Sequence, residues 1–169
     1  MFERVVLGVD PGTSAVGLAC VAGNTTRVRL TWSCTVRTRS SLPTPERLHR
    51  IYRAIGEAIQ AYRPDTVALE RLMWGKNIGS AMEVARASGA VMVAAAEAGV
   101  RVEEYAPLEV KMAVTGAGNA SKEQVRRGLT LLLGQGAVPN EPDAADAVAV
   151  ALCHLRQSRM REIVREAMR

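Results

Sequence analysis

The sequence predicts a single α/β domain, in which an antiparallel group of three strands is followed by alternating helices and strands. Three patterns support this prediction. The β-branched run Val5–Val9 is typical of a buried strand. Residues 27–36 alternate in part between apolar and polar, as in a strand with one wet face. Further along the chain, short apolar runs are separated by segments whose apolar residues follow helical spacing.

Length and composition fit one domain with an aliphatic core. The chain has 169 residues, of which 48% are hydrophobic but only 4% aromatic. The net charge of +5 and the pI near 9.6 favour a polyanionic partner. No apolar run is long enough to span a bilayer, and the N-terminus lacks the layout of a signal peptide. We therefore expect a cytoplasmic protein with no membrane partner.

Cysteine and histidine usage argues against a disulfide framework or a zinc site. Cys20, Cys34 and Cys153 are odd in number and lack CxxC spacing, so we expect reduced thiols. His49 and His154 are too few for a histidine-rich transition-metal site.

The first three strands are predicted from turn signals between apolar runs. The first strand ends at Asp10, where Pro11-Gly12 requires a turn. Small and apolar residues over 12–22 predict a second strand, hairpinned onto the first. Gly23-Asn24 is the next turn signal, and a third strand is expected over Arg27–Val36.

A helix is expected to follow, with Thr44 as its N-cap and Pro45 at its first helical position. It should run to about Tyr62, with His49 on its solvated side. Its predicted buried stripe consists of Leu48, Ile51, Tyr52, Ile55 and Ile59.

The rest of the chain alternates between strands and helices. Strands are predicted at Thr66–Glu70 and Val100–Tyr105. Ser121 and Gln124 fit a capping box at a helix start. Helices are predicted over Ser80–Ala98, near Leu108–Val114, after Ser121, and from a start at Asn140–Asp143.

Four carboxylates stand in strongly apolar sequence. Asp10 and Glu70 each end an apolar run, and the spacing of Asp143 and Asp146 puts both on one helical face. Burying an unpaired carboxylate is costly, so we expect the four to converge on metal ions. The alternative is that Asp10 only caps its turn and that Asp143 is an ordinary helix-start acid.

The loop over 71–77 places Met73 and Trp74 beside Lys76. These large residues either tuck into a local core or touch and unstack a nucleic-acid base. Composition alone favours the first interpretation.

The motifs, taken in order, resemble the RuvC family of Holliday-junction resolvases, over about Val5 to His154. The matching motifs are Gly8-Val9-Asp10-Pro11-Gly12, Leu69-Glu70, Lys76-Asn77, Ser80-Ala81, Glu104-Tyr105-Ala106-Pro107, Val110-Lys111, Gly116, Lys122 and Asp143-Ala144-Ala145-Asp146-Ala147.

This resemblance implies an RNase H-like fold: a five-stranded mixed sheet, with its first three strands antiparallel, flanked by helices. Residues 1–156 would form the single nuclease domain, and 157–169 a basic tail or helix. The implied function is metal-dependent paired hydrolysis of four-way DNA junctions in recombination and repair, leaving 5′-phosphate and 3′-hydroxyl ends. The implied partners are a second copy of the chain and a branch-migration helicase complex.

The resemblance also assigns site residues. Asp10, Glu70, Asp143 and Asp146 would be catalytic and would hold two Mg²⁺ or Mn²⁺ ions, with Asp10 as the bridging ligand. The residues expected to contact DNA are Lys111, Lys122, Lys76, Asn77, Arg86 and Arg126. The family often carries phenylalanine three residues after the catalytic Glu. This chain has Met73 there, followed by Trp74, and both are candidates for the junction contact.

Three other functions stay open at this point. Asp10-Pro11-Gly12-Thr13 resembles the first phosphate loop of actin-like and sugar-kinase-like ATPases, but those proteins need two lobes and this chain has length for one. A non-catalytic nucleic-acid-binding module of the same fold has no use for clustered carboxylates. Another RNase H-like nuclease, acting on RNA or ordinary duplexes, is disfavoured only by the resemblance.

Overall fold

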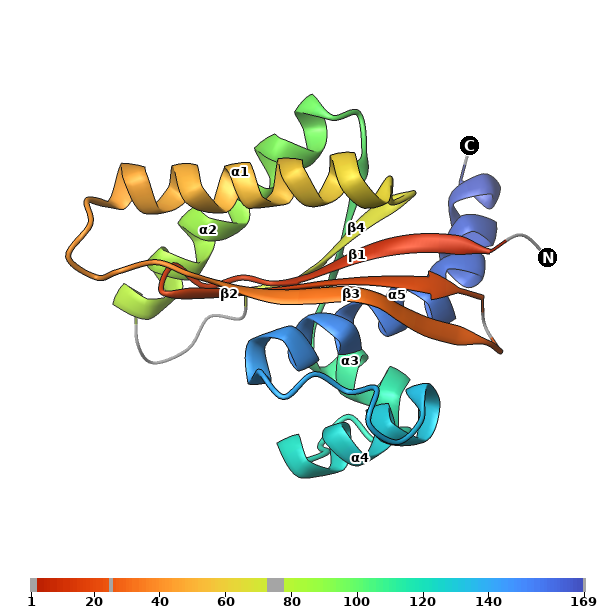
Figure 1. The fold of residues 1–169 in the computed structure, drawn as a ribbon. Coiled ribbons are helices and arrows are strands. Elements are labelled where there is room, and N and C mark those ends of the chain that lie inside the picture. Colours follow the sequence, from red (N-terminus) through yellow and green to blue (C-terminus); the bar gives the residue numbers. More distant parts are fainter. Residues whose placement is uncertain (1–2, 25, 73–77, 169) are drawn as a thin grey trace.

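The computed structural model describes residues 3–24, 26–72 and 78–168, with the backbone alone for 159–166. In this part of the chain, five strands form one sheet in the order β3-β2-β1-β4-β5, and helices cover both of its faces (Figure 1). The strands are β1 (Arg4–Asp10), β2 (Ala15–Gly23), β3 (Val28–Arg37), β4 (Thr66–Glu70) and β5 (Arg101–Tyr105). The helices are α1 (Thr44–Tyr62), α2 (Ile78–Glu97), α3 (Pro107–Thr115), α4 (Lys122–Leu133) and α5 (Pro142–Ala167).

The central strand of the sheet is β1. It pairs antiparallel with β2 and parallel with β4. At the two edges, β3 runs antiparallel to β2 and β5 runs parallel to β4. The predicted fold class is therefore confirmed: the sheet is mixed, and its first three strands are antiparallel.

Side-chain alternation along β1 divides the core into two layers. Leu7 and Val9 pack with α1 and α2 on one face, whereas Val6 packs with α3, α4 and α5 on the other. Gly8 and Asp10 have the same parity as Val6, so they belong to the face that α5 covers. The carboxylate that ends β1 is thereby directed toward the helix that carries Asp143 and Asp146.

The helix α5 lies against β1 and β2 and is central to its layer. Residues 147–155 are buried without exception. Alanine and valine dominate this stretch, and their small side chains allow the helix to approach the sheet closely.

The start of α1 differs from the sequence prediction by one residue. Thr44 is the first helical residue, not the N-cap, and Pro43 takes the cap position without a side-chain hydrogen bond. The Pro43 carbonyl accepts the backbone N–H groups of Glu46 and Arg47, which fixes the helix start there. Pro45 still lies in the first turn, where its missing N–H costs nothing.

The buried stripe of α1 is confirmed at its centre. Ile51, Ile55 and Ile59 are buried, while Leu48 and Tyr52 are half-buried. His49 lies on the exposed side, as its position off the stripe predicts.

The predicted capping box at the start of α4 is confirmed. Ser121 caps α4: its hydroxyl accepts the backbone N–H of Gln124, and the Gln124 side chain accepts the backbone N–H of Ser121. The described part of α2 starts at Ile78, two residues before the predicted Ser80.

Helix α5 continues through residue 156 to Ala167. The division into a nuclease domain over 1–156 and a basic tail or helix over 157–169 stays a prediction.

Two further observations concern the cysteines and the polarity of the helices. The three cysteines form no disulfide in this structure, and Cys20 and Cys153 are buried. Within the described residues, none of the helices combines the length and the apolar character that crossing a membrane requires.

Candidate active site

Two carboxylates lie at the ends of adjacent parallel strands. Val9 pairs with Leu69 in the register of β1 and β4, so Asp10 and Glu70 are the next residues along both strands. Side chains two residues apart in a strand point to the same face of the sheet. Asp10 lies two residues after Gly8, and Glu70 lies two residues after Ala68, which is buried on the α5 side. Both acids therefore face α5. Parallel pairing of two apolar runs of this kind therefore brings their terminal acids together.

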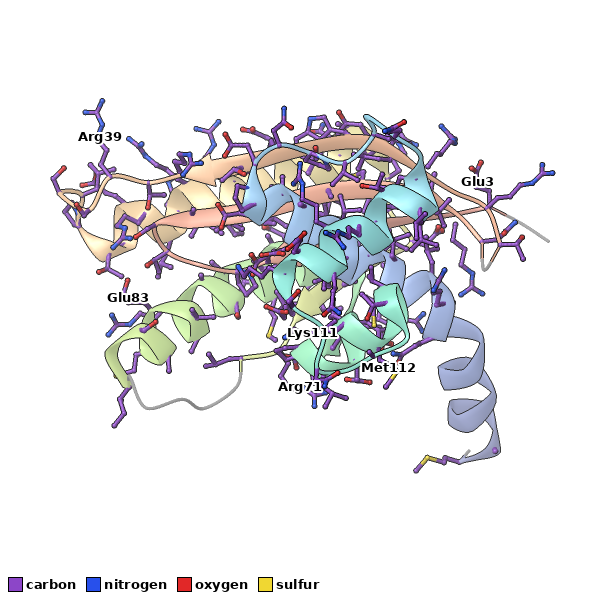
Figure 2. The ribbon with its side chains drawn as sticks, turned by 90° about the horizontal axis from the view of Figure 1, so that it is seen from below. Glu3, Arg39, Arg71, Glu83, Lys111 and Met112 are labelled. Atoms are coloured by element: carbon purple, nitrogen blue, oxygen red, sulfur yellow. The ribbon has the colours of Figure 1, made fainter. Side chains whose placement is uncertain are left out.

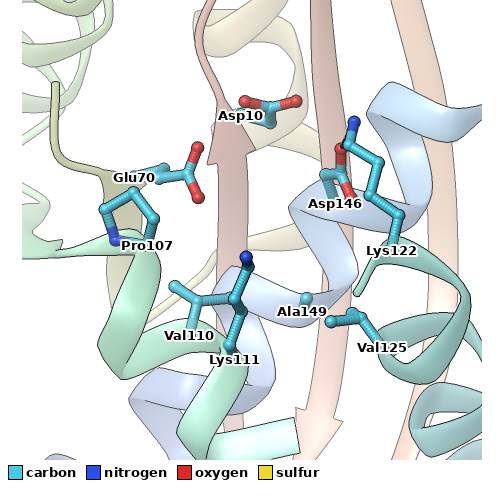
Figure 3. A pocket seen from close by; sticks show the side chains of 9 residues that line it. All are labelled: Asp10, Glu70, Pro107, Val110, Lys111, Lys122, Val125, Asp146 and Ala149. Carbon is cyan, nitrogen blue, oxygen red and sulfur yellow. Dashed lines mark ion pairs between the residues drawn. The ribbon is translucent and has the colours of Figure 1, made fainter. Parts of the chain in front are cut away.

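A cavity of about 300 Å³, here called the acidic cavity, opens at this point. Asp146 reaches it from α5, Lys111 from α3 and Lys122 from α4. Figure 3 shows both lysine side chains directed toward the acidic groups at the strand ends. The residues that line the acidic cavity are Asp10, Glu70, Pro107, Val110, Lys111, Lys122, Val125, Asp146 and Ala149.

Asp143 is placed differently from the other three predicted acids. It is half-buried in the first turn of α5 and is not part of the acidic cavity's lining. Its charge nevertheless raises the pKa of Asp10, so the two carboxylates are electrostatically coupled. The structure thus gathers Asp10, Glu70 and Asp146 around one cavity, with Asp143 beside it.

Burial and mutual repulsion make this site costly to ionise. Burial raises the pKa of Asp10 to about 8, helped by the charges of Glu70, Asp146 and Asp143 and opposed by Lys122. Burial also raises the pKa of Glu70, with Asp146 adding to the effect. Lys122 and Lys111 lower it only in part. The two lysines therefore do not neutralise the acidic cavity.

The donor set fits hard divalent cations. Carboxylate oxygens are the ligands that Mg²⁺ and Mn²⁺ prefer, and a bound cation would relieve the repulsion that raises the pKa of Asp10. Within the described ranges, no three acidic, histidine or cysteine side chains are already arranged to coordinate one ion. One acid is instead paired with a base, since Lys122 Nζ lies 3.5 Å from Asp146 Oδ2 (Figure 3).

The other residues predicted to contact DNA are dispersed. Arg126 donates to the carbonyl oxygen of Pro139 at 3.0 Å. Arg86 pairs with Glu83 on α2 at 3.0 Å, and Figure 2 shows Glu83 well separated from Lys111. Neither arginine lines the acidic cavity. Met73, Trp74, Lys76 and Asn77 lie outside the residues that the structure describes.

Sequence reasoning missed a buried arginine near the turn after Asp10. From α1, Arg47 donates to the hydroxyl oxygens of Thr38 and Ser14, each at 3.0 Å, and lies 3.5 Å from the Glu83 carboxylate. The Thr13 hydroxyl donates to the same carboxylate at 2.7 Å. This cluster, here called the Arg47 network, ties the β1–β2 turn to α1 and α2.

A signal for Arg47 was available in the sequence. Arg47 precedes Ile51 and Ile55 at intervals of four residues, so it extends the apolar stripe of α1. A charged residue in line with a buried stripe indicates that the buried charge has a polar or acidic partner. Its partner Glu83 is 36 residues away, however, and no local pattern identifies it.

Comparison with known proteins gives one consistent result. The family model described as crossover junction endodeoxyribonuclease RuvC matches residues 6–154. The protein of that name from Chloroflexus aurantiacus is 43% identical over 148 residues, which cover 88% of this chain and 90% of the relative. The one from Thermotoga maritima is 38% identical over 161 residues, covering 95% of this chain and 96% of the relative.

Solved structures agree with the sequence relatives. The structure of T. thermophilus RuvC in complex with Holliday junction substrate matches with a TM-score of 0.88 at 39% identity, covering 93% of this chain and 96% of that one. The yeast mitochondrial Holliday junction resolvase matches with a TM-score of 0.65 at 12% identity, which shows a shared fold only; the match covers 93% of this chain and 82% of that one.

We predict that Asp10→Asn stabilises the metal-free protein at neutral and alkaline pH. The ordinary pKa of Asp10 is 3.8 and its folded value is about 8. Between these values the folded state holds a proton that the unfolded state has released, so the free energy of unfolding falls as pH rises. Asn carries no such penalty, and the variant should be more stable than the wild type by on the order of 5 kcal/mol at pH 8.

The measurement is urea unfolding in EDTA at pH 4, 6 and 8. The difference between variant and wild type should shrink toward pH 4. Glu46→Gln, which removes an exposed carboxylate at the start of α1, is the control and should give no such trend. An equal difference at all three pH values would contradict the burial argument.

We also predict that Arg47→Met destabilises the fold by roughly 1–3 kcal/mol, because it leaves the Thr38 and Ser14 hydroxyl groups without the donor that Arg47 supplies. The control is Arg53→Met, which removes an exposed i,i+4 pair with Glu57 and should cost less than about 0.5 kcal/mol. Equal urea midpoints for the two variants would mean that the Arg47 network contributes no more than a surface pair.

Proposed function

The chain belongs to the RuvC family of crossover junction endodeoxyribonucleases, and on this premise we propose that the acidic cavity is where it cuts four-way DNA junctions. The protein is a divalent-metal-dependent endonuclease that resolves Holliday junctions. One observation carries the assignment of the site: Asp10, Glu70 and Asp146 reach one cavity from β1, β4 and α5, together with two lysines.

The acids are assigned as ligands for two Mg²⁺ or Mn²⁺ ions, held by Asp10, Glu70, Asp146 and Asp143. Bound in this way, two divalent cations would stabilise charge on the attacking and leaving oxygens of a phosphodiester. Without a cation, the pKa of about 8 leaves the Asp10 carboxyl mostly protonated at pH 7. At subsaturating metal, cleavage should therefore rise between pH 6 and 8, because a cation must displace the Asp10 proton in order to bind.

The lysines are assigned to the DNA backbone. The Lys122 side chain is 87% exposed although it pairs with Asp146, so its ammonium group is accessible to a phosphate. Lys111 lines the acidic cavity from α3, a different helix from the one that carries Lys122 (Figure 3). Two cations on separate helices would hold phosphates of the scissile strand beside the acids, and in-line attack by water would leave 5′-phosphate and 3′-hydroxyl ends.

Six further residues are proposed to contact DNA. Lys76, Asn77, Arg86 and Arg126 are assigned to more distant phosphates, and Met73 with Trp74 to the junction centre. Arg86 and Arg126 would have to exchange their present acceptors, Glu83 and the Pro139 carbonyl, for phosphate oxygens.

The assembly follows from the substrate. A four-way junction requires two cuts in strands of like polarity, and each chain offers one acidic cavity. We therefore propose a homodimer, with one acidic cavity for each strand. From the family resemblance we also propose a branch-migration helicase complex as a further partner.

The experiment that tests the function is cleavage of a synthetic four-way junction beside a linear duplex of the same sequence, with Mg²⁺, Mn²⁺ or EDTA. We expect symmetric paired nicks on the junction alone, and none in EDTA. Asp10→Asn should lower the cleavage rate at least about 10³-fold while junction binding in EDTA is unchanged. Glu46→Gln should cleave as the wild type does.

Each alternative gives a different result. Equal cutting of junction and duplex would support nuclease activity at the acidic site but exclude selectivity for four-way junctions. Binding without cutting in either metal would favour a non-catalytic module. Loss of junction binding in Asp10→Asn would mean that the carboxylate is structural.

A second prediction concerns the lysines. Lys111→Ala and Lys122→Ala should each weaken junction binding in EDTA and lower the slope of log K against log [salt] by about 1, as loss of one phosphate contact does. Arg53→Ala, which removes an exposed cation on α1, is the matched control. An unchanged salt slope for both lysine variants would remove them from the DNA interface.

A further inference from the structure

The first turns of α5 lie directly on the backbone of the sheet. At Gly17 on β2, an added Cβ atom would fall 1.8 Å from the carbonyl oxygen of Asp143. At Gly8 on β1, it would fall 2.0 Å from the carbonyl oxygen of Ala147 and 2.9 Å from the Cβ of Ala151. Real Cβ atoms essentially never approach another atom within 3.0 Å, so any side chain at either position would displace the helix or the strand.

These two glycines are required for space and not for backbone conformation. Neither Gly8 nor Gly17 is among the residues with positive φ. Both lie in regular strand pairing, Gly8 opposite Ala19 and Gly17 opposite Asp10. The atoms in the way are backbone carbonyl oxygens of a buried helix, which cannot turn aside as the end of a flexible side chain could.

The two contacts are made by the helical turns that carry the acids of α5. Asp143 itself provides the carbonyl oxygen above Gly17, and Ala147 directly follows Asp146. Gly17 is also the cross-strand partner of Asp10. One close contact therefore joins the strand position beside Asp10 to the helical turn that carries Asp143, and the second fixes the next turn.

We propose that Gly17 and Gly8 are positioning residues for the metal site: their missing side chains let α5 approach closely enough for Asp143 and Asp146 to act together with Asp10. The inference rests on the proposed function of the acidic cavity. A methyl group at either position would move the α5 carboxylates away from Asp10 and weaken their joint hold on a cation. Displacements near 1 Å at a catalytic site are enough to cost on the order of 100-fold in rate.

The test compares Gly17→Ala and Gly8→Ala with Gly56→Ala in the full-length protein. Gly56 lies within α1, and an added Cβ there would meet nothing within 4 Å, so this control makes the same chemical change without a clash. Mn²⁺ binding without DNA is followed by the electron paramagnetic resonance signal of unbound Mn²⁺. Each variant is measured well below its own thermal midpoint.

We expect Gly17→Ala and Gly8→Ala to weaken Mn²⁺ binding at least tenfold, and to raise by a similar factor the metal concentration that gives half-maximal junction cleavage. Gly56→Ala should match the wild type in both measurements. A purely structural role would lower the thermal midpoint but leave the Mn²⁺ affinity of the folded molecules unchanged. Junction binding in EDTA should be the same in all variants.

Two results would overturn the inference. One is a folded Gly17→Ala and a folded Gly8→Ala that both bind Mn²⁺ as the wild type does. The other is failure of both variants to fold at any temperature, because the glycines would then serve the core as a whole. If the wild type binds Mn²⁺ but cuts no junction, the proposed function fails, while the Mn²⁺ titration still decides the role of the glycines.

Discussion

Repulsion among partly buried carboxylates is the constraint on which the rest of the molecule depends. Asp10 lies near three other acids, and burial with their charges raises its pKa to about 8. Water would relieve this cost if the acids could move apart. The packing of β1, β4 and α5 prevents that, because each element is anchored in an apolar layer. The stability of the two apolar layers is what holds this unfavourable charge in place.

The fold divides this task between its two layers. The α1–α2 layer fixes the turn that follows Asp10 through the Arg47 network. The α3–α5 layer provides Asp146 and both lysines of the acidic cavity. Strand alternation connects the layers, since neighbouring residues of β1 serve opposite faces. The acidic cavity thus lies on the α3–α5 side of the sheet, and the Arg47 network lies on the α1–α2 side.

Much of this arrangement follows from local sequence patterns. Apolar runs that end in Asp10 and Glu70 predict two buried strands with terminal acids, and the capping box at Ser121 predicts the start of α4. Relations between distant segments were beyond such patterns. The partner of Arg47, the place of Asp143 beside the acidic cavity, and the contact between Gly17 and α5 depend on tertiary packing, which no short window of sequence contains. The lysines were assigned by family resemblance, not by periodicity.

The order of the acids along the chain has a consequence for biosynthesis. Asp10 and Glu70 belong to the first half of the sequence, but Asp146 enters the acidic cavity only when α5 has docked on β1 and β2. A nascent chain still lacking its last segment therefore lacks one of the three acids that line the acidic cavity. Because small domains fold cooperatively, the complete set appears together with the native state. If the acidic cavity is the cutting site, unfinished and misfolded chains are therefore without DNA-cutting activity.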